Sequence, residues 1–323
     1  MSNFKATVLM AVYNTDLNYL NEAIESILNQ TYKNFEFIIV NDGSNKETTD
    51  FLNKLCDPRI NLIHNEKNMG LIYSSNLGFE KAKGEYVLKM DSDDISHPTR
   101  LKKQIEFLDN NPQIDILGTA FEKFPKTKII IPPKDDKDIK YTLRFLYNPL
   151  AHPTVAIRKS TIEKLNMQYN PKDKICEDYG MWLNYIDDVN FANLEDVLLK
   201  YRWHGNNISK KKTDIQSAGA QRVMFEAQGK HFNIDTSKVV EIINKFIDQE
   251  EISSSELEII NDFATQIKNN LGGGKYELNR AFYKRLLKKC KHDFNFIKIV
   301  FSKQTKNLIK LDLFFKIITI LGF

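Results

Sequence analysis

Residues 86–95 read YVLKMDSDDI, a short apolar stretch followed at once by three carboxylates within four positions. Like charges this close raise one another's pKa values, so such a cluster after a buried strand is costly. A divalent cation offsets the cost, because Mg²⁺ or Mn²⁺ is held by one or two carboxylates together with substrate phosphates. A solvated Asp-rich turn before a helix that starts at Pro98 explains the same stretch, because aspartate is common in turns.

The hundred residues around this stretch alternate between two hydrophobic patterns. Four β-type runs cover residues 7–13, 35–40, 60–64 and 86–90. Apolar residues recur at helical spacing between the first two runs, and a shorter helical pattern before the fourth ends near Gly84. Short strands separated by helices are typical of βαβ units in a parallel sheet. Ligands of such sheets bind beyond the carboxyl ends of the strands.

Polar residues stand at three of those carboxyl ends: Tyr13-Asn14, Asn41–Ser44 and Asp91–Asp93. If the first and fourth strands are neighbours, these residues line one crevice. No G-x-G-x-x-G follows any strand, so a dinucleotide cofactor is not expected. An aromatic ring, a carboxylate and a metal cluster suit a nucleoside diphosphate. An ordinary turn at residues 42–44 is the alternative explanation of that segment.

Composition narrows the class of protein. With 323 residues, 42% of them apolar, the chain can form one large domain with an extension, or two domains. The net charge of +4 argues against a polyanion binder, and three widely spaced cysteines fit a reducing cytosol. The apolar run near the N-terminus is too short for a signal peptide, and no stretch is long enough to span a bilayer. We expect a cytoplasmic protein, or one peripheral to the inner face of the cell membrane.

Seven motifs follow one another between about residues 5 and 210: AVYN, NDGS, NMG, GEY…MDSDD, HPT, EDYGMW and YRWH. In this order they resemble the inverting family 2 glycosyltransferases of GT-A fold. More narrowly, they are similar to bacterial lipooligosaccharide and capsule transferases that add N-acetylglucosamine or galactose. The resemblance implies an α/β fold, a Rossmann-like mixed sheet flanked by helices. It also implies a UDP-sugar donor, a glycan or lipid-linked glycan acceptor, and Mn²⁺ or Mg²⁺. We expect residues 1–215 to form the catalytic domain.

The resemblance also assigns roles to individual residues. Those expected at the nucleotide are Ala11, Tyr13, Asn14, Asp42, Asn68, Gly70, Asp91 and Ser92. Tyr13 and Asp42 are expected to contact uracil. The expected metal ligands are Asp91, Asp93 and His204, with Asp93 favoured as the direct ligand, and the expected sugar or acceptor pocket holds Asp94, His152 and Trp182. Many relatives carry an arginine where this chain has Ser75, so a basic contact to the nucleotide from that helix is not expected.

Glu177 and Asp178 open a predicted helix. Two acids at a helix start can simply complement the helix dipole, which is worth about 0.3 to 1 kcal/mol. The resemblance makes Asp178 the general base and Glu177 the second candidate. A nucleotide sugar carries a good leaving group, so a cation to neutralise it and one base suffice, and a single displacement inverts the anomeric carbon. A glycoside hydrolase, by contrast, needs two carboxylates and a water.

The region 216–323 has a different character, with long amphipathic helical patterns and no strand signal. Between Lys275 and Lys316 there are twelve Lys or Arg residues against three acids, interleaved with apolar residues. This pattern is typical of a segment that lies on an anionic membrane. A solvated face, packing on the catalytic domain or a homo-oligomer are the alternatives. Nucleic-acid binding is not expected, because no recognised fold accompanies the charge.

Two other functions compete with sugar transfer. A nucleotidyltransferase that makes nucleotide sugars would carry a Gly-rich basic loop after the first strand, and residues 13–16 are neither Gly-rich nor basic. A non-catalytic glycan-binding protein of the same fold would be favoured by loss of the D-x-D element or of the Glu-Asp pair, and both are present. The sequence does not specify the donor sugar, the acceptor or the linkage.

Overall fold

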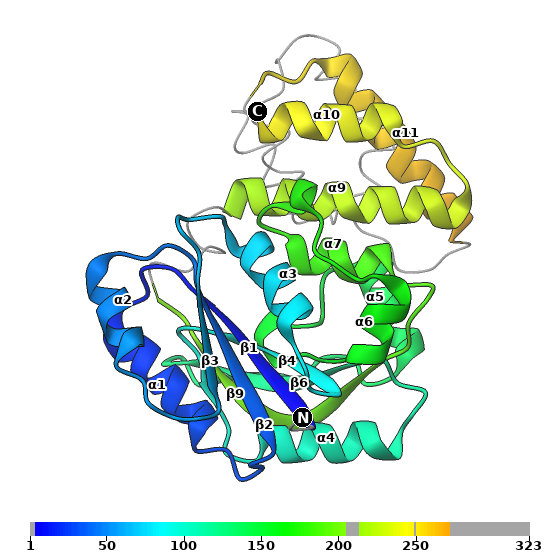
Figure 1. Ribbon diagram of the computed structural model, residues 1–323. Coiled ribbons are helices and arrows are strands. Elements are labelled where there is room, and N and C mark those ends of the chain that lie inside the picture. The colour runs from blue at the N-terminus through cyan, green and yellow to red at the C-terminus, as the bar shows by residue number, and fades with distance from the viewer. Residues whose placement is uncertain (1–3, 205–212, 249, 272–323) are drawn as a thin grey trace. The chain divides into compact units, whose positions relative to one another are not determined.

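The structure is a computed structural model that describes residues 4–204, 213–248 and 250–271 (Figure 1). It divides into two compact units. Unit 1 comprises residues 1–140, 149–172 and 185–205, and unit 2 comprises residues 141–148, 173–184 and 206–323. The domain boundary near residue 215 stays a prediction. Residues 141–148 and 173–184, which come earlier in the chain, belong to the same unit as the C-terminal helices.

Unit 1 is built on one sheet, whose first part matches the predicted parallel strands. The strands in chain order are β1 (Ala6–Val12), β2 (Phe35–Asn41), β3 (Ile60–His64), β4 (Tyr86–Asp91), β5 (Ile95–Ser96), β6 (Ile116–Phe124), β7 (Lys128–Ile130), β8 (Ala156–Arg158) and β9 (Phe191–Arg202). The order across the sheet is β3-β2-β1-β4-β8-β6-β9-β5, with β7 on β6. Strands β3, β2, β1 and β4 are parallel. The first and fourth strands are therefore neighbours, as expected.

The second part of the sheet makes it mixed. Strand β8 runs antiparallel to both β4 and β6, while β9 runs parallel to β6. The short β5, directly after the Asp-rich turn, pairs with the distal part of β9. This pairing brings residues near 200 beside residues near 95. The mixed sheet that the resemblance implies is present in Figure 1.

Helices of unit 1 cover this sheet: α1 (Leu17–Leu28), α2 (Lys46–Asn53), α3 (Leu71–Lys81), α4 (Arg100–Asn110) and α6 (Lys159–Leu165). Helix α5 (Asp136–Phe145) begins in unit 1, and its residues from Tyr141 on belong to unit 2. Helix α1 begins where Asp16 accepts hydrogen bonds from two main-chain N–H groups, and its apolar residues pack in the core of the sheet. Helix α2 was not predicted, because only Thr48 and Leu52 of its residues are buried. Helix α4 begins at Arg100, two residues after the predicted start at Pro98.

Unit 2 contains α7 (Glu177–Asn184), α9 (Thr213–Phe232), α10 (Ser237–Ile247) and α11 (Ser254–Asn270). The last three confirm the helical patterns predicted after residue 215. Their shared core includes Phe225 and Phe263, whose ring centroids lie 4.8 Å apart. A capping box between Ser253 and Glu256 starts α11. No helix within the described ranges is long and apolar enough to cross a membrane. The basic region 275–323 lies outside the described residues.

Candidate functional site

The Asp-rich turn follows β4 at the carboxyl edge of the parallel strands. Asp91 ends β4 and lies opposite Ala11 of β1, which in turn lies opposite Val40 of β2. The loops that leave β1, β2 and β4 therefore start at one edge of the sheet. A hydrogen bond of 2.7 Å between the hydroxyl groups of Thr15 and Ser92 joins the first and the last of these loops.

The loop after β1 is held to the loop after β2. Asn14 adopts a left-handed backbone conformation with φ 51°. Its side-chain oxygen accepts a hydrogen bond from the Asn45 N–H at 2.8 Å, and its own N–H donates to Ser44 Oγ at 3.2 Å. The neighbouring Tyr13 side chain is left 51% exposed at this edge. An exposed ring is available to a nucleotide base, and the contact of Tyr13 with uracil stays a prediction.

Asp42 holds the segment between β3 and α3. Its carboxylate is only 3% exposed and accepts three hydrogen bonds, from Asn65 Nδ2 (2.7 Å), Met69 N–H (2.9 Å) and Gly70 N–H (2.8 Å). A carboxylate can accept about four hydrogen bonds, so one further donor could be accommodated. Its contact with uracil is thus still a prediction, and the structure adds a role in fixing the loop.

Two glycines make this arrangement possible. Gly43 has φ 65°, and a Cβ there would lie 2.3 Å from the main-chain carbon of Lys67. Gly70 has φ 93°, a conformation that side chains rarely adopt, and caps α3. Asn68 lies between Lys67, which Gly43 approaches, and Gly70, and its side chain is exposed. The predicted donor loop is therefore a fixed structure.

Asp93 contacts His204, although 111 residues separate them in the chain. The distance between Asp93 Oδ2 and His204 Nε2 is 2.9 Å. Strand β9 brings them together, because it ends at Arg202 beside the Asp-rich turn. Arg202 Nε donates to the main-chain oxygen of Asp93 at 2.7 Å, and Arg202 N–H donates to Asp94 Oδ1 at 2.7 Å.

Arg202 is itself fixed by three groups. Its guanidinium lies over the rings of Tyr19 (4.2 Å) and Phe124 (4.6 Å) and forms an ion pair with Glu22. Tyr19 also lies against the His204 ring, with centroids 5.4 Å apart. Sequence reasoning missed Arg202 and Tyr19. The YRWH motif was the available signal for Arg202, whereas nothing in the sequence pointed to Tyr19.

Asp94, which is predicted to line the sugar or acceptor pocket, lies in the interior of unit 1. Its side chain is 1% exposed, and Oδ2 has no hydrogen-bond partner among the described residues. Burial, and then the charges of Asp91 and Asp93, raise the pKa of Asp94 well above its usual value. A group in this position can support the turn from inside. Its role in a sugar or acceptor pocket stays a prediction.

The residues at the turn fit a divalent cation when its other ligands come from elsewhere. No three His, Cys, Asp or Glu side chains in the described ranges are close enough to form a metal cage. Asp93 and His204 nevertheless present a carboxylate and an imidazole 2.9 Å apart. Asp91 ends β4, the strand that leads into the turn. Mn²⁺ accepts both donor types. Cations of this class usually retain waters and bind substrate phosphates, which would complete the coordination.

The predicted general base lies in unit 2, at the start of α7. Asp178 Oδ2 accepts a hydrogen bond from Asn148 Nδ2 at 2.9 Å, and Oδ1 accepts one from the Tyr179 N–H at 2.7 Å. The side chains of Glu177 and Asp178 are both half-buried. Their exposure and the partners of Asp178 are compatible with a positioned base, and the catalytic roles stay predictions.

The helix that carries these acids is firmly packed. Tyr179 donates to the main-chain oxygen of Leu143 at 2.6 Å. Asp173 and Arg222 form a buried ion pair at 2.6 Å, and a Cβ on Gly180 would lie 2.2 Å from the Asp173 carboxylate. Only glycine therefore fits at this point of α7, and the helix start cannot shift freely.

Trp182 and His152, which are predicted to line the sugar or acceptor pocket, are both buried in the structure. Trp182 is fully buried on α7. His152 is also buried, and its Nε2 lies 2.7 Å from the hydroxyl of Tyr169. Burial, with a smaller effect of Lys89, holds the pKa of His152 well below its usual value. Both side chains pack in the interior of their own unit, and their roles at the sugar or the acceptor stay predictions.

Comparison with known proteins decides the family. A family model described as "Glycosyl transferase family 2" matches residues 7–169, about half of the chain. The chain belongs to this family. The match spans the strands β1 to β4, the Asp-rich turn and β8. The family 2 resemblance drawn from the motifs is thereby confirmed, and the reaction class is glycosyl transfer.

Relatives support the assignment to family 2 over a longer stretch. An uncharacterized glycosyltransferase of Haemophilus influenzae is 32% identical over 234 residues, which cover 68% of this chain and 72% of the relative. An Escherichia coli protein named UDP-Gal:alpha-D-GlcNAc-diphosphoundecaprenol beta-1,3-galactosyltransferase is 32% identical over 226 residues, 66% of this chain and 79% of the relative.

Solved structures agree with the fold of this family 2 chain. Staphylococcus aureus TarS 1–349 in complex with UDP-GlcNAc has a TM-score of 0.59 at 18% identity, covering 89% of this chain and 84% of that one. A mannosyltransferase of Pyrobaculum calidifontis, in complex with GDP-Man and Mn²⁺, has a TM-score of 0.53 at 13% identity, covering 98% and 86%. The predicted fold, a mixed sheet flanked by helices with a helical C-terminal region, is confirmed.

Proposed function

We propose that this family 2 glycosyltransferase moves a sugar from a UDP-sugar to a glycan acceptor with the help of Mn²⁺ or Mg²⁺. The observation that carries the proposal is the contact between Asp93 and His204 at the carboxyl edge of the strands. The exposed ring of Tyr13 and the loop held by Asp42 lie at the same edge. The Tyr13 ring provides an aromatic surface for the nucleotide base. Asp93 and His204 provide an oxygen and a nitrogen ligand for a cation that also binds the diphosphate.

The relatives support the donor class and the acceptor class. The E. coli relative is named for UDP-galactose and for a sugar linked through diphosphate to undecaprenol. The TarS structure contains UDP-GlcNAc. By analogy we propose UDP-galactose or UDP-N-acetylglucosamine as donor and a lipid-linked glycan of a surface polysaccharide or lipooligosaccharide as acceptor.

Each proposed step uses a named group. A divalent cation, when bound, would neutralise the charge that develops on the departing diphosphate. Asp93 and His204 would hold it, and the fold relative from P. calidifontis was solved in complex with GDP-Man and Mn²⁺. Tyr13 would lie against the uracil, and Asp42 would keep the 65–70 loop closed around it.

Asp178 is the proposed general base. It would remove the proton of the acceptor hydroxyl while that oxygen bonds to the anomeric carbon and the bond to the diphosphate breaks. One displacement then gives inversion. Asn148 holds the Asp178 carboxylate through the hydrogen bond at 2.9 Å, which keeps one oxygen oriented.

A panel of UDP-sugars tests the proposal directly. UDP release should require one donor of the panel, a glycan acceptor and added Mn²⁺ or Mg²⁺, and should stop with a chelator. UDP release that is insensitive to the chelator would contradict the metal role. Failure to bind UDP in the presence of either cation would contradict the donor class. An excess of an alternative nucleotide, GDP, provides the control for base selectivity.

The membrane role of region 275–323 is a separate proposal, since that region lies outside the described residues. Several basic residues near an anionic surface each contribute about 1 kcal/mol, so the region could hold the enzyme near a lipid-linked acceptor. Flotation with anionic vesicles at low and high salt tests it. Absence of binding at low salt would favour packing on the catalytic domain or self-association instead.

A further inference from the structure

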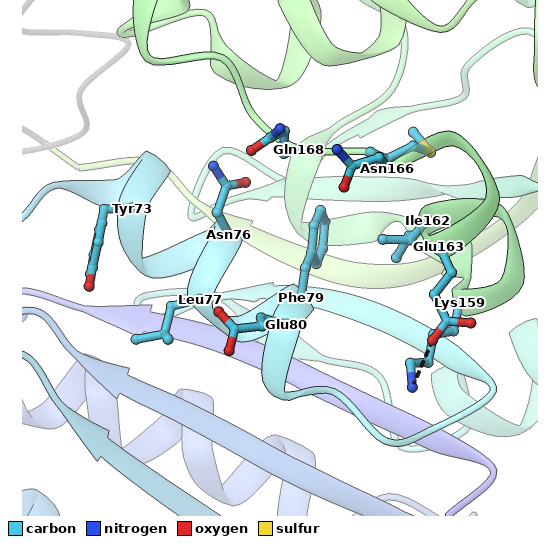
Figure 2. Close-up of a pocket in the computed structure, with 11 residues that line it drawn as sticks. Tyr73, Asn76, Leu77, Phe79, Glu80, Lys159, Ile162, Glu163, Asn166 and Gln168 are labelled. Atoms are coloured by element: carbon cyan, nitrogen blue, oxygen red, sulfur yellow. Dashed lines mark ion pairs between the residues drawn. The ribbon is translucent and has the colours of Figure 1, made fainter.

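A pocket lies in unit 1, on the flank of the sheet and apart from the candidate nucleotide residues at its carboxyl edge. It has a volume of about 450 Å³ and lies between α3 and α6, with the loop that follows α6 as its third side (Figure 2). This volume falls within the roughly 300 to 1,000 Å³ that small-molecule sites occupy. None of the roles assigned above involves the residues that line it.

The walls of the pocket are fixed in advance. Asn76 on α3 makes two hydrogen bonds to the main chain of Tyr169: its Oδ1 accepts at 2.8 Å and its Nδ2 donates at 3.0 Å. At the end of α6, Asn166 takes a left-handed conformation with φ 47°, and the next N–H, of Met167, bonds to Ile162 O at 2.9 Å. A loop tied down at both ends keeps the pocket open without a ligand.

Two aromatic rings supply apolar surface. Phe79 lies between the two helices in Figure 2 and stacks on Tyr169, with centroids 5.3 Å apart and an interplanar angle of 25°. Tyr73 lies at the other end of α3 and is 46% exposed, so its ring is accessible to a ligand. An exposed aromatic ring beside polar groups suits a ligand that has both apolar and polar faces.

The polar groups offer neutral hydrogen bonding. The amides of Asn166 and Gln168 lie on the loop side of the pocket, are exposed, and make no side-chain hydrogen bond with any described residue. Each amide can donate and accept. Among the charged residues, Lys159 is paired with Glu163 at 3.2 Å, and Glu80 is paired with Lys81 at 2.8 Å. The charges at the pocket therefore compensate one another, and the lysine in the lining, Lys159, already has a carboxylate partner, which disfavours phosphates and other anions.

We propose that this pocket binds a neutral saccharide, as a non-reacting stretch of the glycan acceptor. A sugar ring has apolar C–H faces for Tyr73 and hydroxyl groups for Asn166 and Gln168, and it carries no charge. The pocket starts one helical turn after Gly70, whose N–H is bonded to Asp42 of the nucleotide region. The assignment to the acceptor rests on the proposed sugar transfer, whereas saccharide binding itself does not.

Ligand-observed NMR on the full chain tests saccharide binding. The probes are maltotriose, cellotriose and triacetylchitotriose at millimolar concentration, with trigalacturonic acid as the anionic comparison. At least one neutral trisaccharide should bind, and the anionic one should not. Gln168→Ala should weaken binding about threefold to tenfold, the worth of one net hydrogen bond. Gln113→Ala, which removes an exposed glutamine elsewhere in unit 1, is the matched control and should not weaken it.

The aromatic surface is tested separately. Tyr73→Ala should abolish the response, and Tyr73→Trp, which restores a ring, should recover it. Gln168→Ala should bind UDP with the same affinity as the parent. A loss of saccharide binding can then be told apart from damage to the donor site. With an acceptor identified by UDP release, Gln168→Ala should raise its KM by the same factor and leave kcat unchanged. No binding by any neutral trisaccharide, or equal binding by Gln168→Ala and the parent, would overturn the proposal.

Discussion

Arg202 and Asp93 are joined by a hydrogen bond of 2.7 Å, from Nε of the arginine to the main-chain oxygen of the aspartate. The contact spans 109 positions of the chain. It fixes the backbone of the Asp-rich turn, and two residues after Arg202 the imidazole of His204 reaches the Asp93 carboxylate. Arg202 therefore positions both candidate metal ligands without occupying the metal position.

Loss of Arg202 should weaken metal binding in the intact fold. Groups that orient metal ligands are typically worth about 10- to 100-fold in metal affinity. We expect Arg202→Ala to weaken Mn²⁺ binding in the presence of UDP by such a factor, measured by electron paramagnetic resonance of free Mn²⁺. Arg202→Lys keeps the charge but not the geometry and should be intermediate. Arg59→Ala, which removes an arginine paired with Asp57, is the control. Equal Mn²⁺ affinity in all three variants would remove the positioning role.

Asp93 should be required for both metal binding and transfer. Asp93→Ala removes the carboxylate that contacts His204, so metal-dependent UDP binding and UDP-sugar turnover should be lost together. Calorimetric titration of UDP with and without Mn²⁺ measures the first, and UDP release measures the second. Asp91→Ala should behave similarly and more mildly. Undiminished turnover in folded Asp93→Ala would sink the metal assignment.

Asp178→Asn should separate chemistry from donor binding. A positioned general base contributes about 10² to 10⁴ in rate, so kcat should fall by that factor. UDP affinity should stay unchanged, because the proposed base acts on the acceptor hydroxyl. Glu177→Gln, the adjacent acid on the same helix turn, is the matched control and should cost much less. The reverse pattern would transfer the role of base to Glu177.

Gly43→Ala should damage the nucleotide loop. The left-handed backbone alone costs about 1 to 2 kcal/mol per residue, and the new Cβ would also meet the main chain of Lys67. We therefore expect at least this loss in the free energy of unfolding in urea, together with weaker UDP binding. Asn68→Ala trims an exposed side chain of the same loop and should change stability by no more than about 0.5 kcal/mol. Equal stability of the two variants would show that the loop tolerates displacement.

His152 should make the fold sensitive to mild acid. Its pKa is lowered in the folded state, so the unfolded chain binds the proton first as pH falls. The folded state, which keeps His152 neutral, is therefore not penalised above the unfolded pKa of about 6.5. Below that pH, the free energy of unfolding falls by up to about 1.4 kcal/mol per pH unit. His152→Gln should flatten the decline in unfolding free energy between pH 6.5 and 5. His97→Gln, an exposed histidine, is the control and should retain the decline. An identical slope in parent and His152→Gln would rule out this coupling.

Much of the fold could be predicted because its signals are local. The runs at residues 7–13 and 86–90 are apolar over a strand length, and the polar residues after them fall where a parallel sheet binds ligands. Helix α2 escaped prediction because only Thr48 and Leu52 of its residues are buried. The position and the antiparallel direction of β8 in the sheet could not be predicted, because they depend on the pairing of its three residues with β4 and β6.

The sequence by itself determined the family, the parallel half of the sheet and the identity of the Asp-rich turn. The order of the motifs and the spacing of the apolar residues depend only on neighbouring positions in the chain. Only the tertiary structure decided which of these residues meet. The pairing of β5 with β9 brings Arg202 and His204 to Asp93, a contact that no local pattern encodes. The tertiary structure likewise decided that Asp94, His152 and Trp182 are buried, since exposure depends on neighbours supplied by distant segments.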